Sequence, residues 1–423
     1  MPGVLDGYRI LDLTVYQLGP VNTTMLALLG ADVIKIEPPT GEPGRINTRG
    51  RVVAGGEKKG FGGIDLSSYF EVNNQCKRSL VLVLDLKRAK AREVLYKLVA
   101  KSDVFAQNIS PGSAEKLGAG YETLKKYNPK LIYYTGTSFG TKGPDGYKPG
   151  MALSGTARSG WSYMLDRAAD GSPTFNVGGS TDQIAAIMGA FTICLALMTR
   201  ERYGIGQYCE SSHLTASMWF LQCAGQMSYY QGTKISQERA AASRQTAANP
   251  IFNAYKCKDG EWVALVNPVQ RHWAPVCAAL EIPDSLRDDP RFKDPGSRAK
   301  NARECIKMLD EYFVRYTLSE MVNRLEGKDI NWEKVQRWED LPKDPQILAN
   351  EYISFYQHEL TGRLYPMVNL PMKLAATPTV RLGRAPLLGE HTAEILTNVL
   401  GYNKEEVPDL IKEIGEPVPT FSE

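Results

Sequence analysis

The chain has 423 residues, which is too long for one ordinary domain and predicts two domains or one discontinuous pair. Its 50 lysine and arginine residues nearly balance 47 aspartate and glutamate residues, so nucleic acid is not expected as a partner. The 7 cysteines are scattered without a C-x-x-C pair, which is typical of a reducing compartment, and we expect a cytoplasmic protein.

Neither a membrane or secretory segment nor a metal site is expected. No run approaches the roughly 20 apolar residues of a membrane span, and the first residues lack the pattern of a secretory signal. The 4 histidines lie far apart in the sequence, so no metal site is predicted.

The first part of the chain alternates strand-like and helix-like segments. The predicted order is strand 8–13, helix 20–29, strand 32–36, strand 79–84, helix 91–101, strand 103–106 and strand 131–135. This order predicts a parallel sheet with right-handed crossovers, whose ligand sites lie in the loops at the strand ends. Residues 40–75 are rich in glycine and predict a long ordered loop or a flexible insertion.

The second part begins with apolar helical patterns. Residues 182–199 are apolar on most faces and predict a buried helix, and residues 205–231 predict a further helical region. A Lys-Asp-Gly turn at 258–260 between two β-rich segments predicts a hairpin over 253–265. One more helix is expected at 391–400.

This change of pattern defines the expected domains. Residues 1–229 would form the first part of a large α/β domain, and 230–345 a smaller α+β domain. Residues 346–423 would be a linker and a C-terminal part that returns to the large domain.

Standard nucleotide and hydrolase motifs are missing from the sequence. There is no G-x-x-x-x-G-K-[ST] loop and no G-x-S-x-G elbow, and the glycines of 55–63 lack a strand-turn-helix setting. A lone carboxylate, Asp182, opens the long apolar helix. Because Ser180 or Thr181 is a good N-cap and an acidic residue suits the first turn, helix capping is the simpler interpretation from periodicity alone.

Several motifs follow one another in a fixed order. They are LDGYRILDLT at 5–14, LGADVIKIEPP at 29–39, KRS at 77–79, LDLK at 84–87, NISPG at 108–112, GAGYETL at 118–124, RERYGIGQ at 200–207 and LGEHT at 388–392. With these motifs the chain resembles the class III CoA transferases, a family that includes formyl-CoA transferase, carnitine-related CoA transferases and α-methylacyl-CoA racemases. The resemblance runs from about residue 5 to the C-terminus and is weakest over 45–75 and 230–345.

The resemblance implies the roles of several residues. Asp182 matches the family's covalent nucleophile, and Gln17 matches a position beside it that helps to hold the reacting carbonyl. Positions that contact CoA, whose phosphates need cationic or amide donors, are matched by Asn108, Lys87, Lys116 and Lys148.

One departure affects the nucleotide contacts. An arginine that usually follows the second strand is Pro38 here, and Arg45 is a candidate replacement.

The resemblance also implies a reaction and an assembly. Asp182 would accept an acyl group and then CoA from an acyl-CoA donor, and a carboxylic acid acceptor would leave as the new acyl-CoA. CoA and acyl-CoA are substrates, and neither a metal nor a tightly bound cofactor is implied. The implied fold is a discontinuous Rossmann-like large domain with a smaller domain, in an interlocked-ring dimer of identical or related subunits.

Alternatives differ in what they require. A racemase or epimerase of the same superfamily needs a histidine where this chain has Met151, and a thioether cannot take a proton. The glycine-rich loop of formyl-CoA transferase should fall near 240–250, where this chain has no glycine at 241–249. A small, tightly capped pocket is therefore not expected.

A larger acyl pocket has candidate lining residues near the nucleophile. They are Trp161, Tyr163, Met164 and Phe175, for which a place in the core is an equally ordinary interpretation. A non-catalytic CoA-binding subunit would lack the nucleophile, and an unrelated nucleotide-cofactor enzyme would need the missing phosphate motifs.

Overall fold

The computed structural model describes residues 2–46, 67–85, 88–164, 172, 179–234, 243–377 and 382–418. The chain divides into two compact units. Unit 1 comprises Met1–Ser162, Phe175–Met227 and Gln346–Glu423, and unit 2 comprises Tyr163–Thr174 and Ser228–Pro345.

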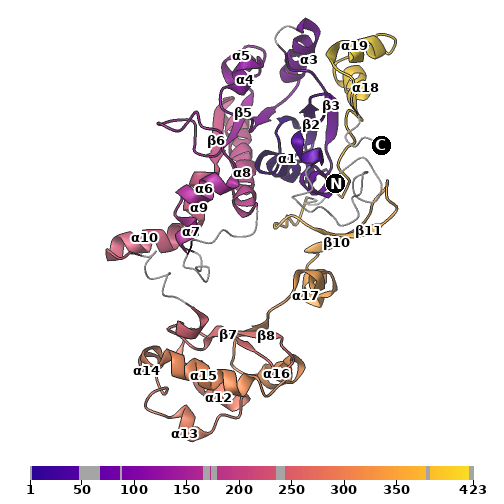
Figure 1. Cartoon of the computed structure of the whole chain (residues 1–423). Coiled ribbons are helices and arrows are strands. Elements are labelled where there is room, and N and C mark those ends of the chain that lie inside the picture. The colour runs from indigo at the N-terminus through magenta and orange to yellow at the C-terminus, as the bar shows by residue number, and fades with distance from the viewer. Residues whose placement is uncertain are drawn as a thin grey trace. The chain divides into compact units, whose positions relative to one another are not determined.

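A parallel sheet forms the centre of unit 1 (Figure 1). Its strands are β1 (Arg9–Leu13), β2 (Asp32–Glu37), β3 (Arg78–Val81), β4 (Val104–Gln107), β5 (Ile132–Thr137) and β6 (Tyr208–Ser212). All neighbouring strands are parallel, and the order β3-β2-β1-β4-β5-β6 is that of a Rossmann sheet. The predicted α/β class and parallel sheet are confirmed.

Helices cover both faces of this sheet because successive strand side chains point to opposite faces. Ile10 and Val33 pack with α1 (Leu18–Leu28) and α8 (Ser180–Tyr203) on one face. Leu11 on the other face packs with the helices α3 (Ala89–Ala100), η6 (Ile395–Val399, a π-helix) and α19 (Val407–Ile414).

Shorter elements connect these layers or extend from them. They are η1 (Pro43–Ile46), α2 (Ser68–Asn73), α4 (Ser113–Lys116), α5 (Tyr121–Leu124), α6 (Ala152–Arg158), α7 (Trp161–Met164), α9 (His213–Phe220), α10 (Gln222–Gln231), α17 (Pro345–Ala349), α18 (Thr392–Glu394) and the antiparallel pair β10 (Ile353–Gln357) and β11 (Leu364–Val368).

Two predictions for unit 1 need a correction in part. The predicted helical region 205–231 is helical in α9 and α10, but it also contains β6, an edge strand whose side chains are mostly exposed or half-buried and therefore carry no apolar strand pattern. The predicted loop 40–75 contains η1 and α2, the latter capped by Ser67, whose hydroxyl accepts a hydrogen bond from the Phe70 amide. Residues 47–66 of that loop lie outside the described residues.

The helix α8 is long and apolar enough, by length and composition, to cross a membrane, contrary to the expectation that no run approaches the length of a span. Only 44% of its apolar window is buried in unit 1. It packs closely there: a Cβ built on Gly189 would lie 2.4 Å from the Tyr134 hydroxyl. Since core helices that never enter a membrane meet the same criterion, α8 alone is weak evidence for a span.

Unit 2 combines an antiparallel sheet with helices. Its strands are β7 (Phe252–Lys256), β8 (Trp262–Val266) and β9 (Trp332–Lys334), and the pairing of β7 with β8 confirms the predicted hairpin. Its helices are η3 (Arg244–Thr246), η4 (Gln270–His272), α12 (Trp273–Ala279), α13 (Asp284–Arg287), α14 (Pro295–Lys300), α15 (Ala302–Phe313), α16 (Leu318–Leu325) and η5 (Trp338–Lys343). Tyr255 stacks on Phe313 in its core, with ring centroids 4.6 Å apart.

Candidate active site

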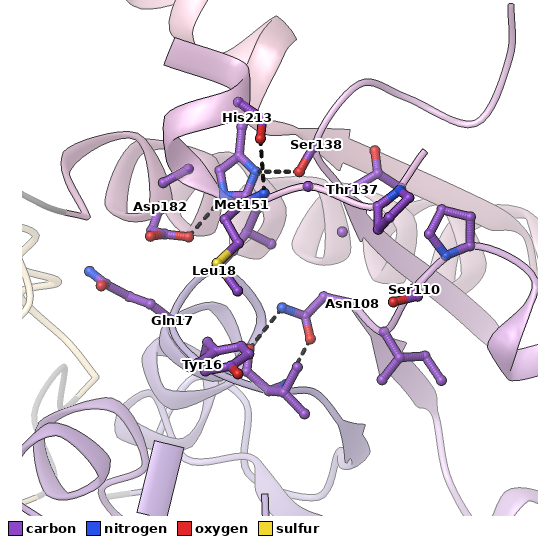
Figure 2. Close-up of a pocket in the computed structure, with 18 of the residues that line it drawn as sticks. Tyr16, Gln17, Leu18, Asn108, Ser110, Thr137, Ser138, Met151, Asp182 and His213 are labelled. Carbon is purple, nitrogen blue, oxygen red and sulfur yellow. Dashed lines mark hydrogen bonds and ion pairs between the residues drawn. The ribbon is translucent and has the colours of Figure 1, made fainter. Parts of the chain in front are cut away.

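A cavity of about 1020 Å³ opens at the carboxyl ends of β1, β4 and β5 in unit 1. Its walls are the loops after these strands and the first residues of α6, α8 and α9 (Figure 2). Open α/β sheets bind ligands where the strand order reverses, which here is between β1 and β4. A second cavity of about 490 Å³ shares Ile109, Ser110, Pro111 and Thr137 with the first.

Asp182 lies in the first turn of α8 and lines the cavity. The N-cap of α8 is Gly179, in the left-handed conformation with φ 84°, and not Ser180 or Thr181 as predicted. The amide dipoles of the helix N-terminus favour an ionised carboxylate at this position. Because 18% of the Asp182 side chain is exposed, a ligand in the cavity can reach it.

His213 contacts Asp182, and no pattern in the sequence predicts this contact. The His213 Nε2 atom lies 2.8 Å from Asp182 Oδ1, and Nδ1 lies 3.3 Å from Ser138 Oγ (Figure 2). The pairing of Thr137 with Ser212 in β5 and β6 explains this meeting, because Ser138 and His213 are the residues that follow. Without β6, the sequence offered no reason to place His213 at the sheet's carboxyl end.

Gln17 is the N-cap residue of α1 and lines the same cavity. Its Nε2 atom donates a hydrogen bond of 3.3 Å to the carbonyl of Gly179. This bond ties the loop between β1 and α1 to the start of α8. The structure therefore places Gln17 and Asp182 in the wall of one cavity.

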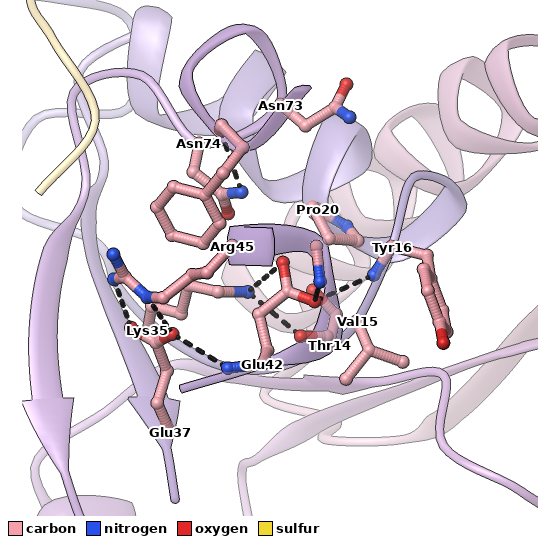
Figure 3. Close-up of polar contacts among 12 residues, drawn as sticks. Thr14, Val15, Tyr16, Pro20, Lys35, Glu37, Glu42, Arg45, Asn73 and Asn74 are labelled. Carbon is pink, nitrogen blue, oxygen red and sulfur yellow. Dashed lines mark hydrogen bonds and ion pairs between the residues drawn. The ribbon is translucent and has the colours of Figure 1, made fainter. Parts of the chain in front are cut away.

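The loop between β1 and α1 also contacts a set of buried charged side chains, which we call the buried ion cluster. Its members are Asp12, Lys35, Glu37, Glu42, Arg45 and Lys77. Lys35 Nζ donates to the carbonyl of Thr14 at 2.9 Å, and Glu42 Oε2 accepts from the Tyr16 amide at 3.1 Å (Figure 3). Burial raises the pKa of Glu42 and lowers the pKa of Lys77 to about 8.

Tyr16, one of the residues held in this way, has a left-handed backbone with φ 64°. Asn108, from the loop after β4, holds the neighbouring Val15 with its side-chain amide. Asn108 therefore lies in the cavity wall, as its expected role requires, but its side chain is already bonded to the protein.

The three lysines predicted to contact CoA lie in different places. Lys148 lines the cavity, with Nζ 2.5 Å from Asp145 Oδ1. Lys116 is exposed at the end of α4 and does not line the cavity, although Ser113 of the same helix does. Lys87 lies outside the described residues.

Arg45 does not reach the cavity. Its guanidinium is fully buried and donates two hydrogen bonds of 2.7 Å to Glu37 and one of 3.2 Å to the Pro386 carbonyl. Since no CoA phosphate could contact it in this arrangement, its suggested role in phosphate binding is wrong, and it acts instead in the buried ion cluster.

The residues that bear on the alternative functions differ in whether they line the cavity. Met151 lines the cavity, so the position at which a racemase would need a histidine does face this site. Trp161 is buried and stacks on Phe220 at 4.8 Å, which places it in the core and not in the cavity wall. Phe175 lies outside the described residues.

Comparison with known proteins identifies the family of this chain. The model of CoA-transferase family III matches residues 5–392, and the chain belongs to that family. It is 32% identical to a succinyl-CoA:mesaconate CoA-transferase of Haloarcula hispanica, over 96% of this chain and 100% of the relative. It is 28% identical to an (R)-2-hydroxy-4-methylpentanoate CoA-transferase of Clostridioides difficile, over 96% and 97% of the two chains.

Solved structures agree on the fold. A CAIB/BAIF family protein of Brucella suis superposes with a TM-score of 0.80 over 94% of this chain and 100% of the other, at 24% identity, which concerns the fold alone. A Mycobacterium tuberculosis protein in an orthorhombic crystal form gives a TM-score of 0.75 at 27% identity, over 93% and 99% of the chains. The protein is thus a CoA-transferase enzyme, whose substrates are a CoA thioester and a carboxylate.

Proposed function

We propose that this enzyme moves CoA from an acyl-CoA donor to a carboxylic acid through covalent intermediates on Asp182. The observation that carries the proposal is the position of Asp182. Its carboxylate stands in the first turn of α8, one oxygen contacts His213, and the side chain lines a cavity of about 1020 Å³.

The proposed reaction has four steps. Asp182 attacks the donor thioester, which gives a mixed anhydride and CoA thiolate. The thiolate attacks the aspartyl carbonyl and releases the donor acid, which leaves an aspartyl-CoA thioester. The acceptor carboxylate then attacks this thioester and expels CoA thiolate, which finally attacks the acceptor side of the new anhydride to release the new acyl-CoA and free Asp182.

Other residues of the cavity support binding in this proposal. Gln17 lies near Asp182 and would hold the reacting carbonyl, and the amide of Gly179 would contribute to the oxyanion site together with Gly178, which lies outside the described residues. Lys148 would contact CoA from the cavity wall, and Lys116 and Lys87 would contact it from outside the described lining.

The racemase alternative is not favoured. The relatives described above are named CoA-transferases, and Met151 occupies the position at which a racemase would need a histidine.

We further propose that the chain self-associates, as the interlocked-ring resemblance implies. The support is an apolar stripe on α8, where Ile187, Phe191, Leu195 and Met198 recur at helical spacing and are 43–56% exposed. Light scattering coupled to size exclusion tests this: a dimer is expected, and a monomer at all concentrations contradicts it.

The covalent route is tested by intact-protein mass spectrometry without an acceptor. Succinyl-CoA leads the donor panel, because one relative is a succinyl-CoA:mesaconate CoA-transferase. Wild type should gain the mass of CoA and lose it with hydroxylamine, and Asp182→Asn should gain nothing.

Asp409→Asn changes an exposed carboxylate on α19 and should behave as wild type. If wild type transfers CoA from a donor in steady state yet never carries CoA, the covalent route is wrong.

A further inference from the structure

The contact between His213 and Asp182 has a defined hydrogen-bond direction. An ionised carboxylate only accepts hydrogen bonds, so the proton of this contact must sit on Nε2 of His213. In the neutral imidazole Nδ1 is then the acceptor, and the Ser138 hydroxyl 3.3 Å away donates to it. These positions of hydrogen atoms are assigned from the network of partners.

The surrounding backbone holds the imidazole in this position. His213 is only 5% exposed, and α6 passes so close that a Cβ on Gly155 would lie 2.3 Å from His213 Cβ. A Cβ on Gly150 would lie 2.7 Å from Ser138 Oγ. Both contacts require glycine, and together they fix the ring and the hydroxyl that orients it.

The contact leaves the two carboxylate oxygens of Asp182 in different environments. Oδ1 accepts from His213, whereas Oδ2 has no hydrogen-bond partner among the described residues. Since a donated hydrogen bond lowers the nucleophilicity of an oxygen, Oδ2 is the oxygen suited to attack the donor. Oδ1 then becomes the carbonyl oxygen of the aspartyl anhydride and of the aspartyl-CoA thioester.

We propose that His213 is a catalytic residue whose Nε2–H stabilises negative charge on Oδ1 whenever the aspartyl carbon is attacked. The proposal rests on the covalent route of the proposed function. When CoA thiolate attacks Cγ of the anhydride, a C–S bond forms and the electron pair of the C=O bond moves to Oδ1. Collapse restores the carbonyl and breaks the C–O bond to the donor acid.

The same donor serves the acceptor half of the reaction. The acceptor carboxylate attacks Cγ of the aspartyl-CoA thioester, Oδ1 again carries the charge, and collapse breaks the C–S bond and expels CoA thiolate. The first attack of Asp182 on the donor differs, because there the charge develops on the donor's own carbonyl oxygen. Loss of the His213 donor should therefore slow the steps at Cγ much more than the first step.

Rapid quench followed by intact-protein mass spectrometry separates these steps. Wild type mixed with a donor it uses should pass quickly to the CoA-sized adduct. His213→Asn keeps a polar side chain that is too short to reach Asp182. Formation of its CoA-sized adduct should be about 10²–10³-fold slower, and the acyl-sized anhydride adduct should accumulate.

His213→Gln is the matched control, because its longer amide can place an N–H near the position of Nε2. Its CoA-sized adduct should form within about tenfold of the wild-type rate, a rescue that a purely structural role would not produce. His213→Phe keeps an aromatic ring without a donor and should behave as His213→Asn. Thermal unfolding and CoA affinity of the three variants identify any loss of folding.

The outcomes are distinct. Wild-type rates of CoA-sized adduct formation in His213→Asn and His213→Phe would overturn the role of His213 and leave the covalent route intact. Equal losses in His213→Asn and His213→Gln would also overturn it, since the donor would then not be what matters. A wild-type enzyme that transfers CoA without any adduct would overturn the covalent route itself, and this role with it.

Discussion

The side-chain amide of Asn108 is bonded to both backbone groups of Val15. The Val15 amide donates to Asn108 Oδ1 at 2.7 Å, and Asn108 Nδ2 donates to the Val15 carbonyl at 2.9 Å. The loop after β4 is thereby fastened to the loop after β1, at the point where the sheet order reverses. This pairing shapes the wall beside Gln17 and Asp182.

Asn108→Asp should weaken this pairing, because a carboxylate keeps the acceptor but loses the donor and faces the Val15 carbonyl. We expect a loss of about 1–3 kcal/mol in the free energy of unfolding, measured by urea denaturation, and a lower kcat/KM for CoA transfer. Asn323→Ala, at an exposed site in α16 of unit 2, should change the stability by less than about 0.5 kcal/mol. Equal effects of the two substitutions would contradict this role for Asn108.

Lys77→Met should be strongly destabilising. Lys77 Nζ is fully buried, lies 2.8 Å from Asp12 Oδ2 and also donates to the Pro20 carbonyl at 2.9 Å. Its removal leaves the buried Asp12 charge with only Lys35, 4.0 Å away, as an ionic partner among the described residues. We expect a loss of about 3–5 kcal/mol in the free energy of unfolding.

The exposed ion pair of Lys97 and Glu93 provides the comparison for Lys77. Its atoms are 2.7 Å apart, yet both side chains are well exposed, so Lys97→Met should cost less than about 1 kcal/mol by urea denaturation. A loss as small as this for Lys77→Met would mean that the buried ion cluster does not stabilise unit 1.

Glu71 should make stability fall as pH rises. Burial raises the pKa of the Glu71 carboxyl from 4.5 to about 7. The hydrogen bonds from the Ala385 amide and the charge of Arg384 lower this pKa, but burial has the larger effect. Between these values the folded protein keeps a proton that the unfolded chain releases. The stabilisation is full below about pH 4.5 and is lost as pH rises through about 7, which amounts to about 3 kcal/mol.

Glu71→Gln tests this dependence. The variant should gain stability relative to wild type as pH rises from about 5 to 8, measured as unfolding midpoints in urea. His358, whose Nε2 lies 3.6 Å from Glu71 and whose pKa is lowered by burial, is present in both proteins and so largely cancels. Glu405→Gln, at an exposed glutamate, should parallel wild type, and a Glu71→Gln curve parallel to both would refute the prediction.

Gly155→Ala should displace His213. The added Cβ would lie 2.3 Å from His213 Cβ, and either α6 or α9 must shift. We expect about 1–3 kcal/mol lower stability and a reduced kcat for transfer, because the bond from His213 to Asp182 lengthens. Gly225→Ala, where a Cβ meets no atom within 4 Å in the helix α10, should keep wild-type kcat in the same transfer assay. Unchanged kcat in both variants would contradict this prediction.

The strands and helices with apolar periodicity were predictable from the sequence. β1, β2, β4 and β5 are buried on both faces and read as short apolar runs, and the small residues of α8 indicated close packing. β6 was not predictable in this way, because an edge strand of mostly exposed residues leaves no such pattern.

The site residues also fall into those that the sequence predicted and those that depend on contacts between distant segments. Asp182 and Gln17 were predictable because a family resemblance pointed to them, and the cavity contains both. His213 depends on the neighbouring positions of β5 and β6, a relation between segments more than 70 residues apart that no local pattern contains. Arg45 was misassigned because the sequence does not reveal that Glu37, at the end of β2, binds its guanidinium.

The left-handed backbone of Tyr16 determines whether the cost of shaping this loop falls on folding or on substrate binding. A residue with a Cβ adopts this conformation at a cost of about 1–2 kcal/mol. Here Glu42 holds the Tyr16 backbone in place by accepting a hydrogen bond from the Tyr16 amide. That cost falls on folding and not on the encounter with substrate. The contacts that hold this loop come from the protein itself, so the free energy of acyl-CoA binding does not have to include the cost of the Tyr16 conformation.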